Sequence, residues 1–185
     1  MSLQFSTPLT GDVVLRPWDP VMAPAMVAAL QANRAHIRRW LGWPSADYDL
    51  EEARQFIALQ REQWAREGLQ GIGIWRGDTL IGGVTPNTVD RDNHSVALGY
   101  WIAASEQGHG LVTQACRLMV DDLFRSRAMH RVVINVQPDN LRSRRVAERL
   151  GVRQEGTLRQ YVRHEDRDSD WVVYAMLADD WIGNS

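Results

Sequence analysis

The chain has 185 residues, a formal net charge of −2 and a pI near 6.2, a balance without the basic footprint of a nucleic-acid-binding protein. A single cysteine, Cys116, excludes an internal disulfide framework and a Cys-based zinc site. All 21 basic residues are arginine, which excludes a Walker-type phosphate lysine and a Schiff-base lysine. We expect one cytoplasmic domain over residues 1–185, with no metal, no nucleic acid and no membrane partner.

The first half of the chain predicts a strand, two helices and a strand hairpin. A helical apolar face runs from Pro20 to Ile37 and is interrupted by Asn33. Asp49 and Glu52 have the spacing of a capping box at the start of the second helix. The expected elements are, in order, Val13–Arg16, Pro20–Ile37, Asp49–Gly68, Gly71–Trp75 and Thr79–Val84.

The second half predicts alternating strands and helices. Its longest helix, ending near Arg127, has an apolar face formed by Val112, Ala115, Cys116, Met119, Val120 and Leu123. The other expected elements are the strands Ser95–Ala103 and Arg131–Val136, the helix Asn140–Leu150, and the strands Glu155–Arg163 and Asp170–Leu177 around an exposed turn, His164–Asp168. This order predicts one α/β domain with a mixed sheet.

The stretch Val96–Thr113 predicts a phosphate site. It passes from a strand through a Gly-rich loop into the long helix, whose first N–H groups have no helical partner and whose positive dipole end is exposed. Gly108 and Gly110 lack the side chains that would keep a phosphate away from the backbone. An anionic ligand is therefore expected here.

Asn140 and Ser143 allow two interpretations. Asn140 has the position of an N-cap, and Ser143 leads the inward face of the following helix, so both could be structural. Alternatively, both point into a cleft between this helix and the Gly-rich loop. Eight arginines and two acids lie between Arg125 and Arg153, a pattern typical of an exposed helix face or of a surface that binds a polyanionic cofactor.

Several segments in a fixed order resemble the GNAT-type N-acetyltransferases. They are Gly99-Tyr100-Trp101, Gln107-Gly108-His109-Gly110 and Asn140-x-x-Ser143-x-x-x-Ala147-Glu148-x-Leu150-Gly151. Further segments resemble the branch of the ribosomal-protein N-terminal alanine/serine acetyltransferases: Asn33-Arg34-x-x-Ile37-x-x-Trp40-Leu41-x-Trp43, Glu155-Gly156-x-x-Arg159 and Val172-Val173-Tyr174. The resemblance implies a mixed, mostly antiparallel sheet with about four helices and a splayed strand pair.

The same resemblance implies that acetyl-CoA lies between the strands Ser95–Ala103 and Arg131–Val136. Ser143 would be a general acid for the departing thiolate, and a backbone N–H near Tyr100 or Trp101 would stabilise the oxyanion. The implied cofactor-binding residues are Tyr100, Trp101, Ile102, Gln107, Gly108, His109, Gly110, Leu111, Val112, Thr113, Asn140, Ser143 and Arg144.

Three positions depart from the family pattern. Val112 stands where Gly or Ala is usual, and Ala97 and Val162 stand where relatives often carry a glutamate base. In a regular strand His164 shares a face with Val162, which makes it either the candidate base or an exposed turn residue. A lysine amine with a pKa of about 10.4 is about 0.1% neutral at pH 7.4, whereas an α-amine with a pKa of about 7.7–8.0 is roughly 20–35% neutral. A site without a strong base therefore favours an N-terminal amine.

The acceptor pocket is expected from five residues, namely Asn33, Arg34, Trp40, Trp43 and Tyr161, although both tryptophans could instead pack in the core. The leading hypothesis is an acetyltransferase that acts on a peptide N-terminus. A small-molecule amine acetyltransferase and a non-catalytic acyl-CoA-binding protein are the alternatives. A homodimer is a further expectation. His36, His94 and His130 have no ligand-like spacing and are expected to be surface or structural residues.

Overall fold

The computed structural model describes residues 6–164 and 167–182, apart from the side chains of His164 and Ile182. The described strands form one sheet in the order β1-β2-β3-β4-β5-β6-β8-β7, in which β5 and β6 are parallel and every other neighbouring pair is antiparallel. The strands are β1 (Thr7–Thr10), β2 (Val13–Pro17), β3 (Ile72–Arg76), β4 (Thr79–Asp90), β5 (Ser95–Ile102), β6 (Arg131–Val136), β7 (Arg153–His164) and β8 (Arg167–Leu177).

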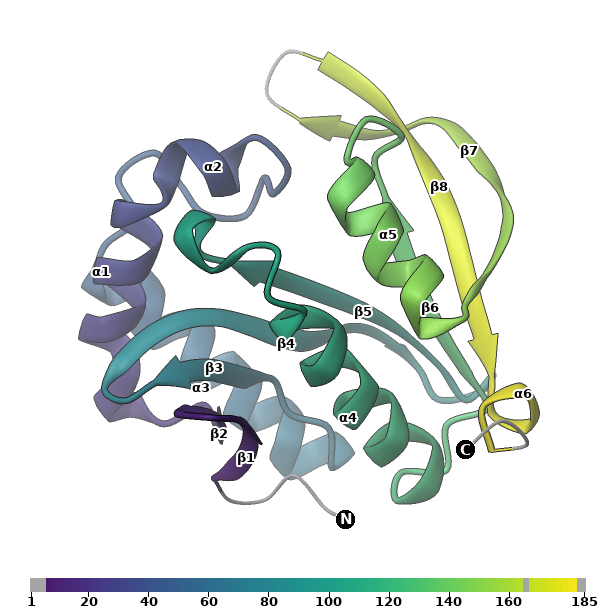
Figure 1. Cartoon of the computed structure of the whole chain (residues 1–185), viewed down its shortest axis with the longest axis horizontal. Helices are drawn as coiled ribbons and strands as arrows, with labels where there is room; N and C mark the ends of the chain where they lie inside the picture. Colours follow the sequence, from purple (N-terminus) through teal and green to yellow (C-terminus); the bar gives the residue numbers. More distant parts are fainter. Residues whose placement is uncertain (1–5, 165–166, 183–185) are drawn as a thin grey trace.

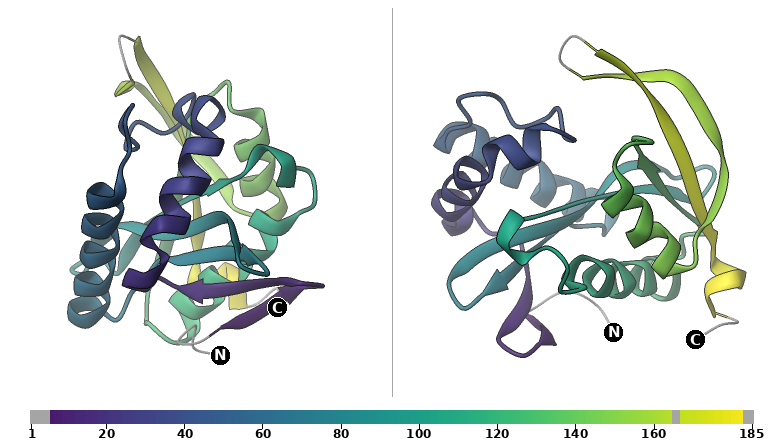
Figure 2. Two further views of the ribbon diagram at one scale, coloured as in Figure 1. Left: turned by 90° about the vertical axis from the view of Figure 1, so that its left-hand side faces the viewer. Right: turned by 45° about the horizontal axis from the view of Figure 1, so that its top comes forward.

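Helices cover both faces of this sheet (Figures 1 and 2). Four substantial helices are α1 (Ala23–Ala32), α3 (Leu50–Glu67), α4 (Leu111–Arg125) and α5 (Leu141–Leu150). The short elements are η1 (Pro20–Met22), α2 (Arg34–Arg38), η2 (Ala104–Glu106) and α6 (Ala178–Ile182). This is the mixed α/β architecture expected from the sequence. In the part of the chain that the structure describes, no helix is both long and apolar enough to cross a bilayer.

Two apolar clusters hold the layers together. The larger one lies between the sheet and α4, whose Ala115, Cys116 and Leu123 are fully buried. The smaller one joins α1 and α3 to the opposite face through Trp18 and Trp75. The apolar face predicted for α4 is therefore the face that it buries, and burial of such a stripe is what stabilises a helix in a globular protein.

The helix expected over Pro20–Ile37 is wrong as a single element, because the chain breaks at Asn33. The backbone of Asn33 departs from helical angles (φ −111°, ψ 15°) between α1 and α2. Its side-chain amide donates to the Ala29 carbonyl at 2.9 Å, and its Oδ1 accepts from the Ala104 N–H at 2.9 Å. A side chain that bonds the backbone in this way competes with the helical ladder.

Helix ends follow the predicted caps. The side chain of Asp49 accepts from the Glu52 N–H at 2.9 Å, and Glu52 reaches back to the Asp49 N–H at 3.1 Å, so the capping box of α3 is confirmed. Asn140 caps α5 by accepting from the Ser143 N–H at 3.2 Å. Gly68 and Gly151 end α3 and α5 with left-handed backbone angles, which glycine adopts without steric cost.

Several strand and helix limits differ from the sequence-based expectations. β4 continues past Val84 to Asp90 because it pairs with β5 along nearly its whole length, with an irregularity after Pro86. β7 continues to His164 and β8 begins at Arg167, so both strands enter the segment that was expected to be a turn, and its residues 165–166 lie outside the described part of the chain. β1, which pairs with β2, and the short α6 were not expected, and α4 ends at Arg125 instead of near Arg127.

Candidate active site

The parallel strands β5 and β6 separate after a short paired stretch (Figure 1). Their last paired residues are Ala97 and Val133, yet β5 continues to Ile102 and β6 to Val136. The edge of β5 beyond Ala97 therefore has no strand neighbour on the β6 side. This arrangement confirms the expected splayed pair.

The backbone of Tyr100 and Ile102 faces this open edge. The next residue, Ala103, donates its N–H to the Ile81 carbonyl at 2.7 Å, toward β4. Backbone groups of successive strand residues alternate between the two edges, so the carbonyl of Ile102 and both backbone groups of Tyr100 point away from β4. The backbone groups of Tyr100 offer an extended, amide-containing ligand partners like those of an added strand, whereas the Ile102 backbone already bonds His36.

The cofactor loop, Gln107–Gly110, follows η2 and leads into α4. Gly108 and Gly110 have φ of 87° and 75°, and an added Cβ at Gly108 would meet nothing within 4 Å. The first helical N–H to find a backbone partner is that of Gln114, which donates to the Gly110 carbonyl at 3.0 Å. Among the described residues, the N–H groups from Gly108 to Thr113 form no hydrogen bond with a backbone carbonyl. These open N–H groups at a helix N-terminus suit a diphosphate.

Tyr100 and Ser143 meet beside the open edge of β5. The phenol oxygen of Tyr100 lies 2.8 Å from Ser143 Oγ, and it also donates to the Ser143 carbonyl at 3.2 Å. Burial raises the pKa of Tyr100 above its ordinary value, with a smaller lowering by its hydrogen bond to Ser143. The phenol is therefore protonated at neutral pH. Its single proton bonds either the Ser143 carbonyl or Ser143 Oγ, and in the first case Oγ donates to the phenol oxygen.

Asn140 and Arg144 flank Ser143 on α5. The Asn140 side chain is used as a cap through its oxygen, as described above. Arg144 Nε donates to the phenol oxygen of the buried Tyr174 at 2.9 Å, and this hydrogen bond raises the pKa of Arg144. Both residues thus have structural partners within this part of the fold, and their predicted contacts with the cofactor stay predictions.

His36 was not predicted at the site, but it contacts the cofactor loop. Its Nε2 lies 2.8 Å from the side-chain amide nitrogen of Gln107, and it forms a hydrogen bond with the Ile102 backbone. Burial lowers the pKa of His36, with a smaller lowering by the charge of Arg142. Spacing could have indicated this role for His36, because it lies three positions after Asn33, which was already predicted to line the acceptor pocket.

The five predicted acceptor residues do not share one pocket in this structure. Asn33 is bonded to Ala104, and Trp40 accepts a hydrogen bond through its carbonyl from Gln137 at 3.4 Å. Trp43, 42% exposed, stacks on Phe56 with ring centroids 5.5 Å apart. Tyr161, 61% exposed, packs on Trp171 at 5.1 Å in the β7–β8 hairpin.

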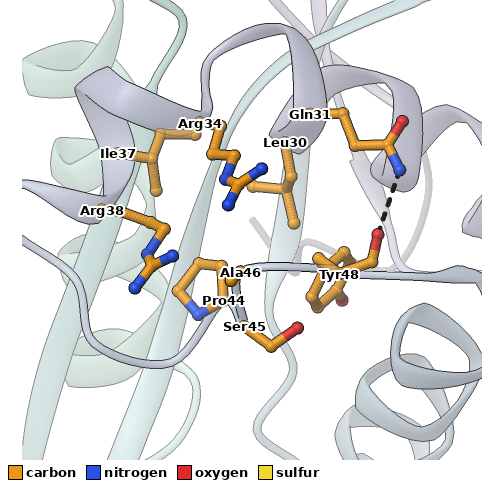
Figure 3. Close-up of a pocket in the computed structure, with 9 residues that line it drawn as sticks. All are labelled: Leu30, Gln31, Arg34, Ile37, Arg38, Pro44, Ser45, Ala46 and Tyr48. Carbon is orange, nitrogen blue, oxygen red and sulfur yellow. Dashed lines mark hydrogen bonds between the residues drawn. The ribbon is translucent and has the colours of Figure 1, made fainter.

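Arg34 lines a shallow pocket formed by α1, α2 and the loop after α2 (Figure 3). The guanidinium groups of Arg34 and Arg38 both extend toward the segment that carries Pro44 and Ala46, and no acidic residue lines the pocket. Arg34 and His36 are two positions apart, which places their side chains on different faces of the helix. This pocket is therefore apart from the contacts of His36 with the cofactor loop.

The positions where relatives often carry a glutamate lie within the strands. Ala97 is half-buried in the last rung of the β5–β6 pair, and Val162 is half-buried opposite Ser169. β5 and β6 carry no acidic residue, and the one acid of β7, Glu155, is bonded by Arg131 at 2.9 Å. That hydrogen bond lowers the pKa of Glu155, so it is a poor base. The side chain of His164 lies outside the described residues, and its assignment as a base stays a prediction.

Comparison with known proteins agrees with this geometry. The family model for the Acetyltransferase (GNAT) domain matches residues 12–153. The protein YdaF of Bacillus subtilis (strain 168) is 28% identical over 182 residues, which are 97% of this chain and 98% of that protein. The ribosomal-protein-serine acetyltransferase of Escherichia coli (strain K12) is 29% identical over 147 residues, 80% of this chain and 82% of that protein.

A solved structure of RimL, described as ribosomal L7/L12 alpha-N-protein acetyltransferase in complex with coenzyme A, has the same fold. Its TM-score is 0.88 at 26% identity, and the match covers 95% of this chain and 99% of that chain. The open edge of β5 and the N–H groups of the cofactor loop fit the pantetheine and diphosphate parts of that cofactor. The chain belongs to the GNAT family of acetyl-CoA-dependent N-acetyltransferases and is related to its ribosomal-protein N-acetyltransferases.

Proposed function

We propose that this chain acetylates the N-terminal α-amine of a protein in the cytoplasm. Bound acetyl-CoA supplies the thioester that the amine attacks. The observation that carries the proposal is the Tyr100–Ser143 pair, with 2.8 Å between its oxygens, beside the open backbone edge of β5. We assign Ser143 as the proton donor to the departing sulfur. In this proposal the phenol of Tyr100 donates its single proton to Ser143 Oγ during the reaction, so that the serine proton is available to the sulfur.

The scarcity of bases favours an α-amine over a lysine side chain. Ala97 and Val162 replace the carboxylates that relatives often carry, and the pKa of Glu155 is held low by Arg131. An α-amine is neutral in a substantial fraction of molecules at neutral pH, so it needs little help in losing a proton. The printed names of the relatives, ribosomal-protein-serine acetyltransferase among them, point to the same class of acceptor.

Paired peptides test this proposal. One peptide of each pair has a free α-amine and no lysine, and the other has a blocked N-terminus and one lysine in the same sequence. Release of coenzyme A thiol from acetyl-CoA is measured for both, with the acetylated product identified by mass spectrometry. We expect the free α-amine to react at least tenfold faster.

Three results would contradict the proposal. Faster reaction of the lysine peptide would show that an internal base is present. Turnover confined to a panel of small amines would assign the chain to small-molecule acetylation. Thermal stabilisation by acetyl-CoA without thiol release from any amine would instead indicate an acyl-CoA-binding protein.

The homodimer also belongs to this proposal. Tyr161, which is exposed and packs on the half-buried Trp171 of the β7–β8 hairpin, provides apolar surface for a second copy. Light scattering on the purified chain distinguishes a dimer from a monomer, and a monomer at micromolar concentration would contradict it.

A further inference from the structure

Asn33 ties the junction of α1 and α2 to the start of η2. Its Oδ1 accepts the N–H of Ala104 at 2.9 Å, while its amide nitrogen donates to the Ala29 carbonyl at 2.9 Å. One side chain thus joins the end of a helix to the segment that enters the cofactor loop. The two residues are 71 positions apart in the chain, so this contact is a tertiary restraint on the loop.

His36 makes a second tie, at the other end of η2. An amide nitrogen can only donate a hydrogen bond, so the 2.8 Å contact with Gln107 requires His36 Nε2 to be the acceptor. The hydrogen bond with the Ile102 backbone favours the charged ring, which means that the imidazole donates to the carbonyl. The neutral ring with its proton on Nδ1 satisfies both contacts, and burial favours that form by lowering the pKa.

These two ties hold a loop that otherwise has few restraints. Gly108 and Gly110 give the loop no side chains to pack, and glycine has the largest backbone freedom to lose on ordering. A further restraint comes from the sheet, where Arg76 bonds Glu106 at 2.9 Å. A loop that is already ordered before binding costs less entropy when its N–H groups receive an anion.

The segment Asn33–Trp40 also reaches the other splayed strand. Its last residue, Trp40, accepts a hydrogen bond from Gln137, which directly follows β6. Asn33 and His36 contact the β5 side, at Ala104 and Ile102. The segment therefore links the two sides of the opening in which the cofactor fits.

We propose that Asn33 and His36 are positioning residues that hold the cofactor loop in the conformation that binds the diphosphate of coenzyme A. Neither residue needs to touch the ligand, because each acts through the backbone or side chain of the loop. The proposal concerns the cofactor of the family and is independent of which amine is the acceptor.

The test measures binding of coenzyme A to the full chain by calorimetry, without an acceptor. Asn33→Leu and His36→Phe remove the two hydrogen bonds of each side chain at similar size, and each is expected to raise the Kd about fivefold, mainly through loss of the bond to Ala104 or to Gln107. Asn33→Asp keeps an oxygen for the Ala104 N–H, and His36→Gln keeps an acceptor for Gln107. We expect both to stay within about twofold of wild type.

Ala35→Ser is the matched control, since Ala35 is exposed on the same short helix. Hydrogen exchange of the unliganded chain provides the second measurement, and residues 104–110 should exchange faster in the Leu and Phe variants, with unchanged melting temperature. Unaltered affinity and exchange in both variants would overturn the proposal. Equal losses in the conservative variants would do so as well, because they would show a packing role. If Asn33→Leu fails to fold, His36→Phe still tests the proposal, because phenylalanine keeps a ring at position 36.

Discussion

Removal of the Ser143 hydroxyl distinguishes an effect on kcat from an effect on the binding of coenzyme A. The hydroxyl lies 2.8 Å from the Tyr100 phenol and heads α5 without entering the buried core. Ser143→Ala is expected to lower kcat by about 10²-fold or more, the range for loss of a general acid. The Kd for coenzyme A, measured by calorimetry, should change by less than about threefold, since one neutral hydrogen bond at most is lost.

Tyr100→Phe is the companion variant, because it keeps the ring and removes the partner of Ser143. The raised pKa of Tyr100 means that its phenol stays protonated through pH 10. The wild-type rate should therefore show no decline from Tyr100 ionisation between pH 6 and 9.

An unchanged rate in Ser143→Ala would remove the serine from the mechanism.

Substitution of Gly108, whose φ is positive, tests whether the cofactor loop binds a phosphate. With φ of 87° and open space around its Cβ position, Gly108→Ala strains the backbone by about 1 kcal/mol and places a methyl group beside the open N–H groups. We expect at least tenfold weaker binding of coenzyme A, measured by calorimetry. Gly77→Ala is the control, since Gly77 has φ of 56° in the β3–β4 turn and also meets nothing within 4 Å. A comparable loss in that variant would show that strain alone explains the effect.

At the scale of elements, the N-cap of α5, Asn140, has two predicted roles, helix capping and cofactor binding, which two variants can separate. Asn140 caps the helix with its oxygen, and its amide N–H groups are the donors that the family resemblance assigns to the pantetheine. Asn140→Asp keeps the capping oxygen and removes the donors, whereas Asn140→Ala removes both. We expect the Asp variant to keep its melting temperature and lose affinity for coenzyme A. The Ala variant should also lose about 1 kcal/mol of stability.

A purely structural Asn140 would give a different pattern. Affinity for coenzyme A would then follow stability, and the Asp variant would bind as tightly as wild type. Thermal unfolding and calorimetry on the same two variants distinguish these outcomes.

Local rules explain which elements were predictable. The capping box at Asp49, the stop at Gly151 and the apolar face of α4 depend on residues within a few positions of one another, and these predictions are confirmed. The break at Asn33 depends on a hydrogen bond to Ala104, 71 residues away. The length of β4 depends on its pairing with β5. Such contacts have no signature in a short window of sequence.

The whole molecule assembles its site from segments that are distant in the chain. The cofactor loop is contiguous, so its glycines locate it in the sequence, and its contact with the cofactor stays a prediction. The Tyr100–Ser143 pair spans 43 residues and the His36–Gln107 contact spans 71. The parallel pairing of β5 with β6 and its early end bring Tyr100 to α5, whereas the contact of α2 with the cofactor loop brings His36 to Gln107. Family resemblance could predict Tyr100 and Ser143 separately, but their direct contact and the role of His36 required the tertiary structure.

Alkaline pH should destabilise the whole fold through a few identifiable groups. The chain has no lysine, and arginine stays charged throughout the accessible range. Burial raises the pKa of the Cys116 thiol above its ordinary value, so the folded state keeps a proton that the unfolded state releases. Stability from Cys116 is therefore complete below pH 8.5 and is lost as the pH rises toward the folded-state pKa. At about 1.36 kcal/mol per pH unit, the loss reaches ~2 kcal/mol by pH 10.

Urea unfolding at pH 7, 8.5 and 10 measures this dependence, and Cys116→Ala supplies the comparison. The variant loses some packing at every pH, but its free energy of unfolding should fall less between pH 8.5 and 10 than that of the wild type. Tyr48 and Tyr100, whose pKa values are also raised by burial, lower the stability of both proteins equally above pH 10, so the difference between the two curves still measures the thiol. Parallel curves from pH 8.5 onward would contradict the assignment, since they would show that the thiol ionises equally in the folded and unfolded chains.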